Sequence, residues 1–159
     1  MRDQFKFPGM RVLQFAFSVE AKDGDDRPST YPRNCVVYTG THDNDTTAGW
    51  FHSKAGEGST RSQEEIEAEK RVVLGHLGTD GSEIHWDMIR VALESSADTA
   101  IFPLQDVLGL DSSARMNVPG SNRGNWQWRV SDGVPDMATR KRLYDLTRAA
   151  KRIGRRDAS

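Results

Sequence analysis

Residues 35–47, CVVYTGTHDNDTT, place a short apolar run directly before a cluster of small and polar residues. The run over residues 35–39 is rich in β-branched side chains, which predicts a strand covered on both faces, as in a parallel sheet. Residues 40–45 then end the strand. Because α/β folds build their sites at the carboxyl ends of parallel strands, this stretch indicates both the fold class and the place of a site.

The neighbouring segments extend the same pattern. Residues 10–17 follow Pro8-Gly9 and predict a strand, and residues 100–104 predict a third strand that ends at Pro103, which lacks a backbone donor. Apolar spacing predicts helices over residues 63–77 and 137–153. A further helix is predicted to begin with Ser82 as its N-cap and to bury an inner face that contains Ile84, Met88, Ala92 and Ser95. Residues 19–34, 53–61 and 109–125 are rich in glycine, proline and polar residues and predict loops. Alternating strands and helices favour one α/β unit over residues 1–159.

Composition excludes several classes of protein. The chain has 159 residues, 36% of them hydrophobic, a net charge of −1 and one cysteine. A charge near zero gives no argument for a nucleic-acid partner, and no apolar run of about 18 residues predicts a membrane span. Cys35 cannot form an internal disulfide and the first twenty residues resemble no signal peptide, so we expect a cytoplasmic protein. The basic residues of the helix and tail over 137–159 are expected to form a solvated face.

The first candidate site follows the strand over residues 35–39. His42, Asp43 and Asn44 supply an imidazole, a carboxylate and an amide, and a carboxylate can accept charge-assisted hydrogen bonds from vicinal sugar hydroxyls. A turn in which Asp43, Asn44 and Asp45 bond their own backbone is an equally ordinary use of such residues. A metal site from His42, Asp43 and Asp45 is the weaker alternative, because no further histidine or cysteine lies at ligand spacing.

A second group of polar residues follows the strand over residues 100–104. Gln105 and Asp106 lie at its end, and Arg115 and Asn117 on the loop behind it could donate to hydroxyls or to a carboxylate. Each of these taken alone is more typical of a structural role. The segment 125–129, NWQWR, offers tryptophans that could stack on sugar rings, but alternating aromatics favour a short strand packed on a core.

These stretches resemble one known family. The runs PGMRVLQFAF, YPRNCVVYTGTHDNDTTAGW, IFPLQDVLGLDSSARMNVPG and NWQWR are similar, in the same order, to the C-terminal part of 4-α-glucanotransferases. These enzymes are also called amylomaltases or disproportionating enzymes and form glycoside hydrolase family 77. The likeness extends over about residues 2–130, and THDNDT, LQDVLGL and ARMN are its most specific motifs.

The resemblance implies a fold and an activity. The family fold is a (β/α)₈ TIM barrel, of which this chain would supply about the sixth to eighth strands with their helices, leaving the barrel unclosed because a full barrel needs ~250 residues. The family transfers α-1,4-glucan segments with retention, using a nucleophile and an acid/base on earlier strands, the latter in an AEDLG-like motif that is missing here. The resemblance carries Asp43 over as the transition-state stabiliser and His42 as a second sugar-binding group. The expected substrate contacts are Asn44, Gln105, Asp106, Arg115 and Asn117.

This assignment leads to expectations for the isolated chain. We expect a C-terminal fragment, translated from an internal methionine, or one half of a split enzyme completed by an N-terminal partner. Either would be inactive alone, unless Asp43, Asp45 and Asp106 could replace the absent carboxyl pair. The alternative is a non-catalytic carbohydrate-binding or interaction module. The expected ligands are α-1,4-glucans such as maltooligosaccharides, and the exchange of one glycosidic bond for another needs neither a cofactor nor a metal.

Overall fold

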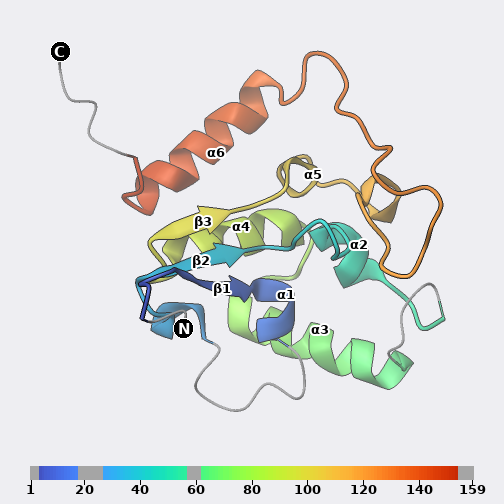
Figure 1. Ribbon diagram of the computed structural model, residues 1–159, viewed down its shortest axis with the longest axis horizontal. Helices are drawn as coiled ribbons and strands as arrows, with labels where there is room; N and C mark the ends of the chain where they lie inside the picture. The colour runs from blue at the N-terminus through green and yellow to red at the C-terminus, as the bar shows by residue number, and fades with distance from the viewer. Residues whose placement is uncertain (1–3, 18–26, 57–61, 154–159) are drawn as a thin grey trace.

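Three parallel strands form the sheet of the computed structural model, which describes residues 4–17, 27–56 and 62–153 (Figure 1). The strands are β1 (Gly9–Val12), β2 (Cys35–Tyr38) and β3 (Thr99–Ile101), in the order β1-β2-β3. The pairing places Met10 beside Val36 and Val37 beside Ala100. The helices are α1 (Leu13–Ala16), α2 (Thr47–His52), α3 (Gln63–Leu77), α4 (Ile84–Glu94), α5 (Leu104–Val107) and α6 (Met137–Ala149), with 3₁₀ turns η1 (Pro28–Thr30) and η2 (Ser112–Ala114).

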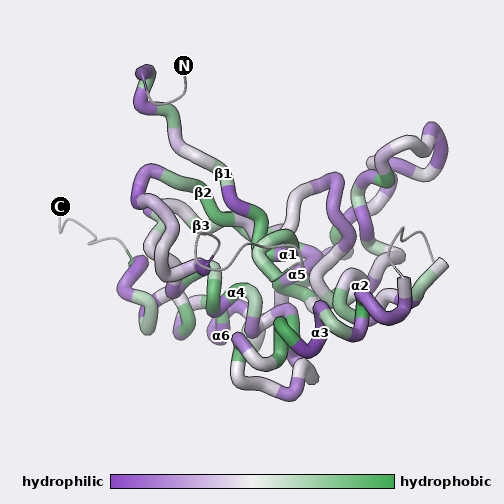
Figure 2. Tube along the Cα trace, turned by 90° about the horizontal axis from the view of Figure 1, so that it is seen from below, coloured by the Kyte–Doolittle hydropathy of each residue, from purple (hydrophilic) through white to green (hydrophobic). Residues whose placement is uncertain are grey.

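Helices cover one face of this sheet among the described residues. Figure 2 shows α3, α4 and α6 together on one side of the three strands. Along β2 the side chains of Cys35 and Val37 are buried, whereas Val36 and Tyr38 are half-buried. Met10 on β1 is 59% exposed. Among the described residues, helices thus cover the face of β2 that carries Val37, and Val36 lies half-buried on the opposite face, as expected for strands of an unclosed barrel.

The main core lies between the sheet and α4. Met88 and Ala92 of α4 are fully buried against Leu13, Val37 and Val73. The predicted inner face of this helix is confirmed, since Ile84, Met88, Ala92 and Ser95 are all buried. The predicted N-cap is wrong, because Glu83 holds the cap position and the backbone of Ser82 instead donates to Asp80.

Helix α3 has the predicted bounds because its end signals are strong. Ser62 and Glu65 form a capping box at its start, and Gly78 ends it in the left-handed conformation. Ile66, Val73 and Leu77 are buried along one face, as their spacing predicts.

The other strands are shorter than the sequence predicts. β1 ends at Val12, where its pairing with β2 ends, and a helical turn then brings Leu13 and Phe17 onto one buried face. β3 ends at Ile101, and Leu104 belongs to the helix that follows Pro103. Part of the expected loop over residues 19–34 lies outside the described residues; Pro28 and Tyr31 in its remainder are buried.

Helix α2 was not expected from the sequence. The hydroxyl of Thr46 caps it by accepting from the backbone N–H of Gly49 at 3.1 Å, and Trp50 and Phe51 enter the core. Because polar residues precede α2, the sequence pattern does not mark where this helix starts.

Helix α6 lies against the outer side of α4. Its apolar residues Leu143 and Leu146 pack on a second cluster that contains Trp86 and Ile89. Arg142 forms a two-point ion pair with Glu83, at 2.5 and 2.7 Å, and lies 4.6 Å above the ring of Trp86. None of the described helices is long and apolar enough to span a bilayer.

Candidate functional site

The predicted site residues gather where the strands end. All three strands point toward α1, α2 and α5, so the loops after β2 and β3 meet at the end of the sheet that is formed by the carboxyl ends of the strands (Figure 1). This end is the carboxyl edge of the sheet. A cavity of about 180 Å³ opens there. It is lined in part by four predicted residues, His42, Asn44, Gln105 and Arg115. This volume is below the roughly 300–1,000 Å³ that is usual for ligand pockets.

Asp43 is held in place by residues of the later loop. The side-chain amide of Asn117 donates to Oδ1 of Asp43 at 2.6 Å, and Nε2 of His42 lies 3.4 Å from the same oxygen. Arg115 donates to the backbone carbonyl of Asp43 at 2.6 Å. The side chains of Asp43 and His42 are 51% and 55% exposed, which leaves the carboxylate accessible to a ligand.

The backbone joins the same two loops. The N–H of Asn117 donates to the carbonyl of His42 at 3.1 Å, and Nε of Arg115 donates to the carbonyl of Asn117 at 2.8 Å. Residues more than seventy positions apart in sequence are thus fixed beside one another. Such a frame pre-organises Asp43 before any ligand arrives.

Asn44 and Gln105 have structural contacts as well as places in the cavity wall. Oδ1 of Asn44 accepts from both the backbone N–H and the hydroxyl of Thr41. These bonds form a local turn, which is the structural alternative that the sequence offers for this residue. Gln105 is buried and donates to the carbonyl of Ala114 at 3.2 Å.

Asp106 has a different environment from the one expected. It is 1% exposed, and its two carboxylate oxygens accept from the hydroxyl of Thr39 at 2.5 Å and from the N–H of Thr47 at 2.7 Å. Burial raises the pKa of this carboxyl. The expected direct sugar contact is not supported by this arrangement, because the side chain faces the interior and joins the end of β2, the start of α2 and α5.

Asp45 is also engaged within the protein. Its Oδ2 accepts from the hydroxyl of Ser112 at 2.7 Å, its Oδ1 accepts from the N–H of Thr46, and its carbonyl accepts from Gln14. Within residues 4–17, 27–56 and 62–153, no group of three or more histidine, cysteine, aspartate or glutamate side chains has the geometry of a metal site. His42, Asp43 and Asp45 therefore form no ligand cluster here.

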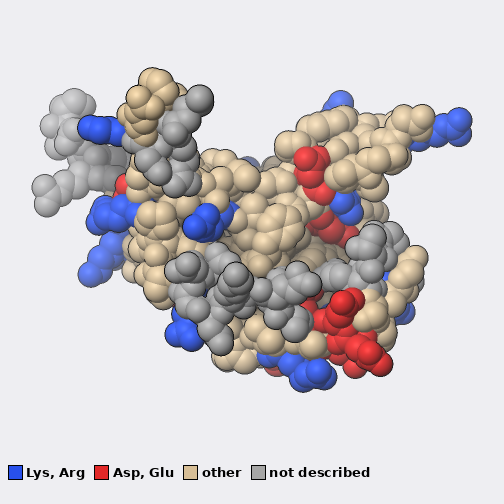
Figure 3. All heavy atoms as spheres, turned by 60° about the horizontal axis from the view of Figure 1, so that its bottom comes forward, with Lys and Arg blue, Asp and Glu red and all other residues tan. Residues whose placement is uncertain are grey.

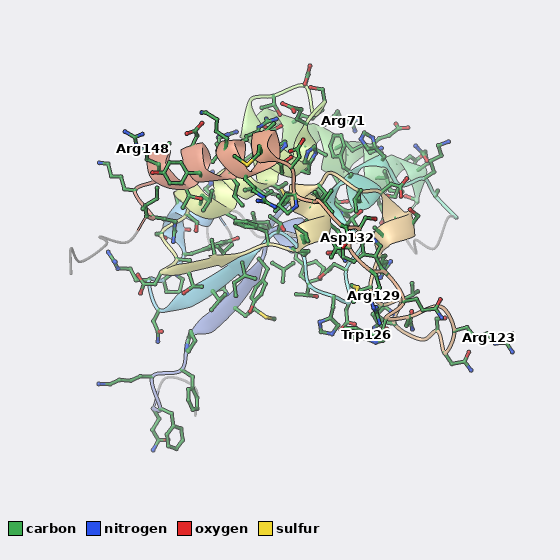
Figure 4. All side chains as sticks on the ribbon, turned by 90° about the horizontal axis from the view of Figure 1, so that it is seen from above. Arg71, Arg123, Trp126, Arg129, Asp132 and Arg148 are labelled. Carbon is green, nitrogen blue, oxygen red and sulfur yellow. The ribbon has the colours of Figure 1, made fainter. Side chains whose placement is uncertain are left out.

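Trp126 lies beside the site, contrary to the core packing that the sequence favours. Residues 125–129 form no strand, and the Trp126 side chain is 52% exposed. Its ring centroid lies 5.2 Å from that of His42. Figure 4 shows Trp126 and Arg129 on a loop that projects from the carboxyl edge. Figure 3 shows basic side chains at the tip of the projection at the upper right, and both acidic and basic ones around its base. The glycine and asparagine before Trp126 were the available signal for a loop.

The fold is that of an α/β protein whose candidate site residues lie at the carboxyl edge of a parallel sheet. The profile of one family, described as 4-alpha-glucanotransferase (glycoside hydrolase family 77), matches residues 1–135, and the chain belongs to this family. It is 50% identical over 131 residues to a 4-alpha-glucanotransferase of Synechocystis sp., covering 81% of this chain and 24% of the relative. It is 39% identical over 155 residues to that of Thermus thermophilus, covering 96% and 30%.

Solved structures agree with this family. An amylomaltase from Streptococcus agalactiae in complex with acarbose is similar with a TM-score of 0.81 and 27% identity, over 96% of this chain and 29% of that one. An amylomaltase from Corynebacterium glutamicum shares the fold, with a TM-score of 0.60 and 18% identity over 92% of this chain and 26% of that one. The chain thus spans about a quarter to a third of the length of the relatives that it matches.

Proposed function

We propose that this chain forms the part of a 4-α-glucanotransferase that holds the glucan next to the bond being exchanged. The observation that carries the proposal is the exposed carboxylate of Asp43, fixed by Asn117 and His42 at the carboxyl edge of the sheet. A carboxylate in this setting can accept hydrogen bonds from two vicinal hydroxyls of one glucosyl unit.

In this proposal the sheet is a segment of a (β/α)₈ barrel. β1, β2 and β3 would be its sixth, seventh and eighth strands, and the uncovered face of the sheet would face the interior of the barrel. The parallel order of the strands and the helices on one face support this assignment. Sites of such barrels lie at the carboxyl ends of the strands, where Asp43 is found.

The reaction of the whole enzyme would transfer an α-1,4-glucan segment to the 4-hydroxyl of another glucan with retention. Retention requires a nucleophile and an acid/base whose carboxyl groups lie about 5–5.5 Å apart. Hydrogen bonds to sugar hydroxyls strengthen as the oxocarbenium-like transition state forms, and Asp43 would contribute in this way. Arg115 would keep the loop of Asp43 rigid, and His42 would bind a further hydroxyl.

The same proposal holds that the chain is inactive alone. Of the acids that the structure describes near the cavity, Asp45 is bonded to Ser112 and Asp106 is buried, which leaves Asp43 without a partner carboxyl of the required kind. Bond cleavage would then depend on groups carried by another part of the barrel.

Calorimetric titration of the chain with maltoheptaose tests the sugar-binding role. We expect weak, saturable binding that Asp43→Asn weakens at least tenfold, or about 1.4 kcal/mol. Glu64→Gln, the same chemical change at an exposed position of α3, is the control and should leave the affinity unchanged. The absence of heat at millimolar maltoheptaose would contradict the proposal.

A transfer assay tests the proposal that the chain is inactive alone. Incubation of the chain with maltotriose should release no glucose. Release that Asp43→Ala abolishes would show that this chain carries its own catalytic pair. Saturable binding without any transfer, even when a polypeptide with the rest of the barrel is added, would favour a non-catalytic carbohydrate-binding module.

A further inference from the structure

We infer that the indole of Trp126 is a platform on which a pyranose ring of the bound glucan stacks beside Asp43. This inference rests on the proposed function and adds a subsite to it. Trp50 and Trp86 serve the core and are 8% and 6% exposed, whereas Trp126 is 52% exposed. Exposure alone does not single out this indole, since Phe15 is 64% exposed, but Trp126 also lies beside His42 and Asp43.

The position of the ring supports a ligand contact. Its centroid lies 5.2 Å from that of His42, with the two planes tilted by 37°, and His42 in turn lies beside the Asp43 carboxylate. Figure 4 shows Trp126 on the projecting loop, on the side of the sheet that the helices leave uncovered. An apolar surface and an exposed acceptor therefore adjoin at the edge where the glucan would bind.

The backbone at Trp126 is unusual for a large residue. Its φ of +62° lies in the left-handed region, which glycine or asparagine adopts at far lower cost. The conformation is held by the N–H of Trp126, which donates to the carbonyl of Met116 at 2.7 Å, and by Arg129, which donates to the carbonyl of Trp126 at 2.8 Å. This costly conformation places the exposed indole beside His42, and a function of the indole there would account for it.

The chemistry of an α-glucan matches these two groups. A pyranose ring presents C–H groups on its faces and hydroxyls around its rim. The flat, apolar indole can cover one face of the ring. Asp43 can accept hydrogen bonds from the hydroxyls on the rim, and His42 can donate to them or accept from them. Because His42 touches both Trp126 and Asp43, the stacked ring and the ring held by Asp43 belong to the same or adjacent glucosyl units.

The left-handed backbone provides a clean test of this subsite. Trp126→Gly removes the indole at a position that favours glycine, so the melting temperature should not fall, while the dissociation constant for maltoheptaose should rise at least tenfold. Trp126→Phe keeps a smaller ring and should give an intermediate loss. Tyr144→Ala, which removes an exposed aromatic side chain from α6, is the control and should not change the affinity.

The outcomes separate the platform from the proposed function. In ¹⁵N-labelled chain, the indole N–H signal that Trp126→Phe removes should shift most during titration with maltoheptaose. Binding that Asp43→Asn weakens but Trp126→Gly leaves intact would overturn the platform and keep the proposed function. No binding by the unmodified chain would overturn both. If the glycine variant does not fold, Trp126→Asn, which also tolerates the left-handed backbone, decides in the same way.

Discussion

Asp43 and Asp106 both follow strands of the same sheet, and burial determines what each can do. Asp43 is about half exposed and accepts from Asn117 through Oδ1, so a ligand can still reach its carboxylate. Asp106 is 1% exposed, and both its oxygens accept from neighbouring chain segments. One aspartate is therefore suited to hold a substrate, and the other holds the loop that carries the first.

Removal of the Asp106 side chain should destabilise the fold. Asp106→Ala leaves the buried N–H of Thr47 without its acceptor, which costs about 1–3 kcal/mol of the free energy of unfolding. Asp106→Asn can still accept from Thr47 and donate to Thr39, so its loss should be smaller. Urea denaturation of the two variants at neutral pH measures this order. Equal losses would show that the two hydrogen bonds contribute little.

The raised pKa of Asp106 predicts a dependence of stability on pH. Because burial raises the pKa in the folded state above its ordinary value of 3.8, the folded chain keeps a proton that the unfolded chain has lost. The free energy of unfolding should therefore fall as the pH rises from about 3.8 through the folded pKa. Asp106→Asn should lack this fall when urea denaturation is repeated between pH 4 and 8.

The exposed carboxyl of Asp111 provides a control, because its pKa is shifted in the direction opposite to that of Asp106. Hydrogen bonds from the side chain and backbone of Ser113 lower the pKa of Asp111, so its contribution is present above the ordinary value and is lost as the pH falls. The difference in stability between the unmodified chain and Asp111→Asn should thus grow with rising pH. Differences of the same sign for Asp106 and Asp111 would contradict the assigned environments.

At the scale of elements, α2 depends on a close approach at Gly49. A Cβ placed there would lie 2.3 Å from the hydroxyl of Ser112 and 2.7 Å from Oδ1 of Asp45. Gly49→Ala should therefore lower the free energy of unfolding by about 1–3 kcal/mol through overpacking and separate Asp45 from Ser112. Gly75→Ala in α3, where a Cβ meets nothing within 4 Å, should raise it by about 0.5–1 kcal/mol. Thermal denaturation of both variants checks the opposite signs.

The carboxyl end of α4 depends on Arg152. Its guanidinium donates to the carbonyl of Leu93 in the last turn of α4, which has no partner within the helix, and to those of Ser95, Ala97 and Asp98 in the segment that follows. Arg152→Ala should lower the free energy of unfolding by about 1.5–3 kcal/mol, the range for hydrogen bonds to charged groups. Arg148→Ala, at an exposed position of α6, should change it by less than about 0.5 kcal/mol. Similar effects of the two in urea denaturation would count against this capping role.

Some elements follow from the sequence and others do not. Helix α3 could be predicted because Ser62, Glu65 and Gly78 mark its ends locally. The end of β1 could not be predicted, since it is set by pairing with β2. The start of α2 could not be predicted either, because its cap Thr46 lies among other polar residues.

The same distinction applies to the site. The sequence predicts which strand ends carry polar side chains, and the structure brings His42, Asn44, Gln105 and Arg115 to one cavity. It does not predict whether a given side chain faces that cavity or the interior, so the burial of Asp106 and the exposure of Trp126 required the fold. Both depend on hydrogen bonds between residues far apart in the chain or in different loops.

At the scale of the whole molecule, the sheet has two open edges and one uncovered face within the described residues. β1 and β3 each pair on one side, and Met10, Phe15 and Ile101 are 59%, 64% and 45% exposed. Unpaired strand edges and exposed apolar residues favour association with other chains. A polypeptide that supplies neighbouring strands would satisfy the edges and cover the open face.

Complementation tests whether that polypeptide is the rest of a 4-α-glucanotransferase barrel. The Synechocystis relative, truncated to omit the region that this chain matches, should co-purify with this chain and regain glucose release from maltotriose. Met10→Lys should weaken co-purification, because it places a charge on the face that must be buried. Asp43→Asn should leave the complex intact and reduce transfer by at least a hundredfold, whereas Glu64→Gln should change neither. Failure of the two polypeptides to associate, or transfer that does not depend on Asp43, would exclude this chain as the sugar-holding part of the enzyme.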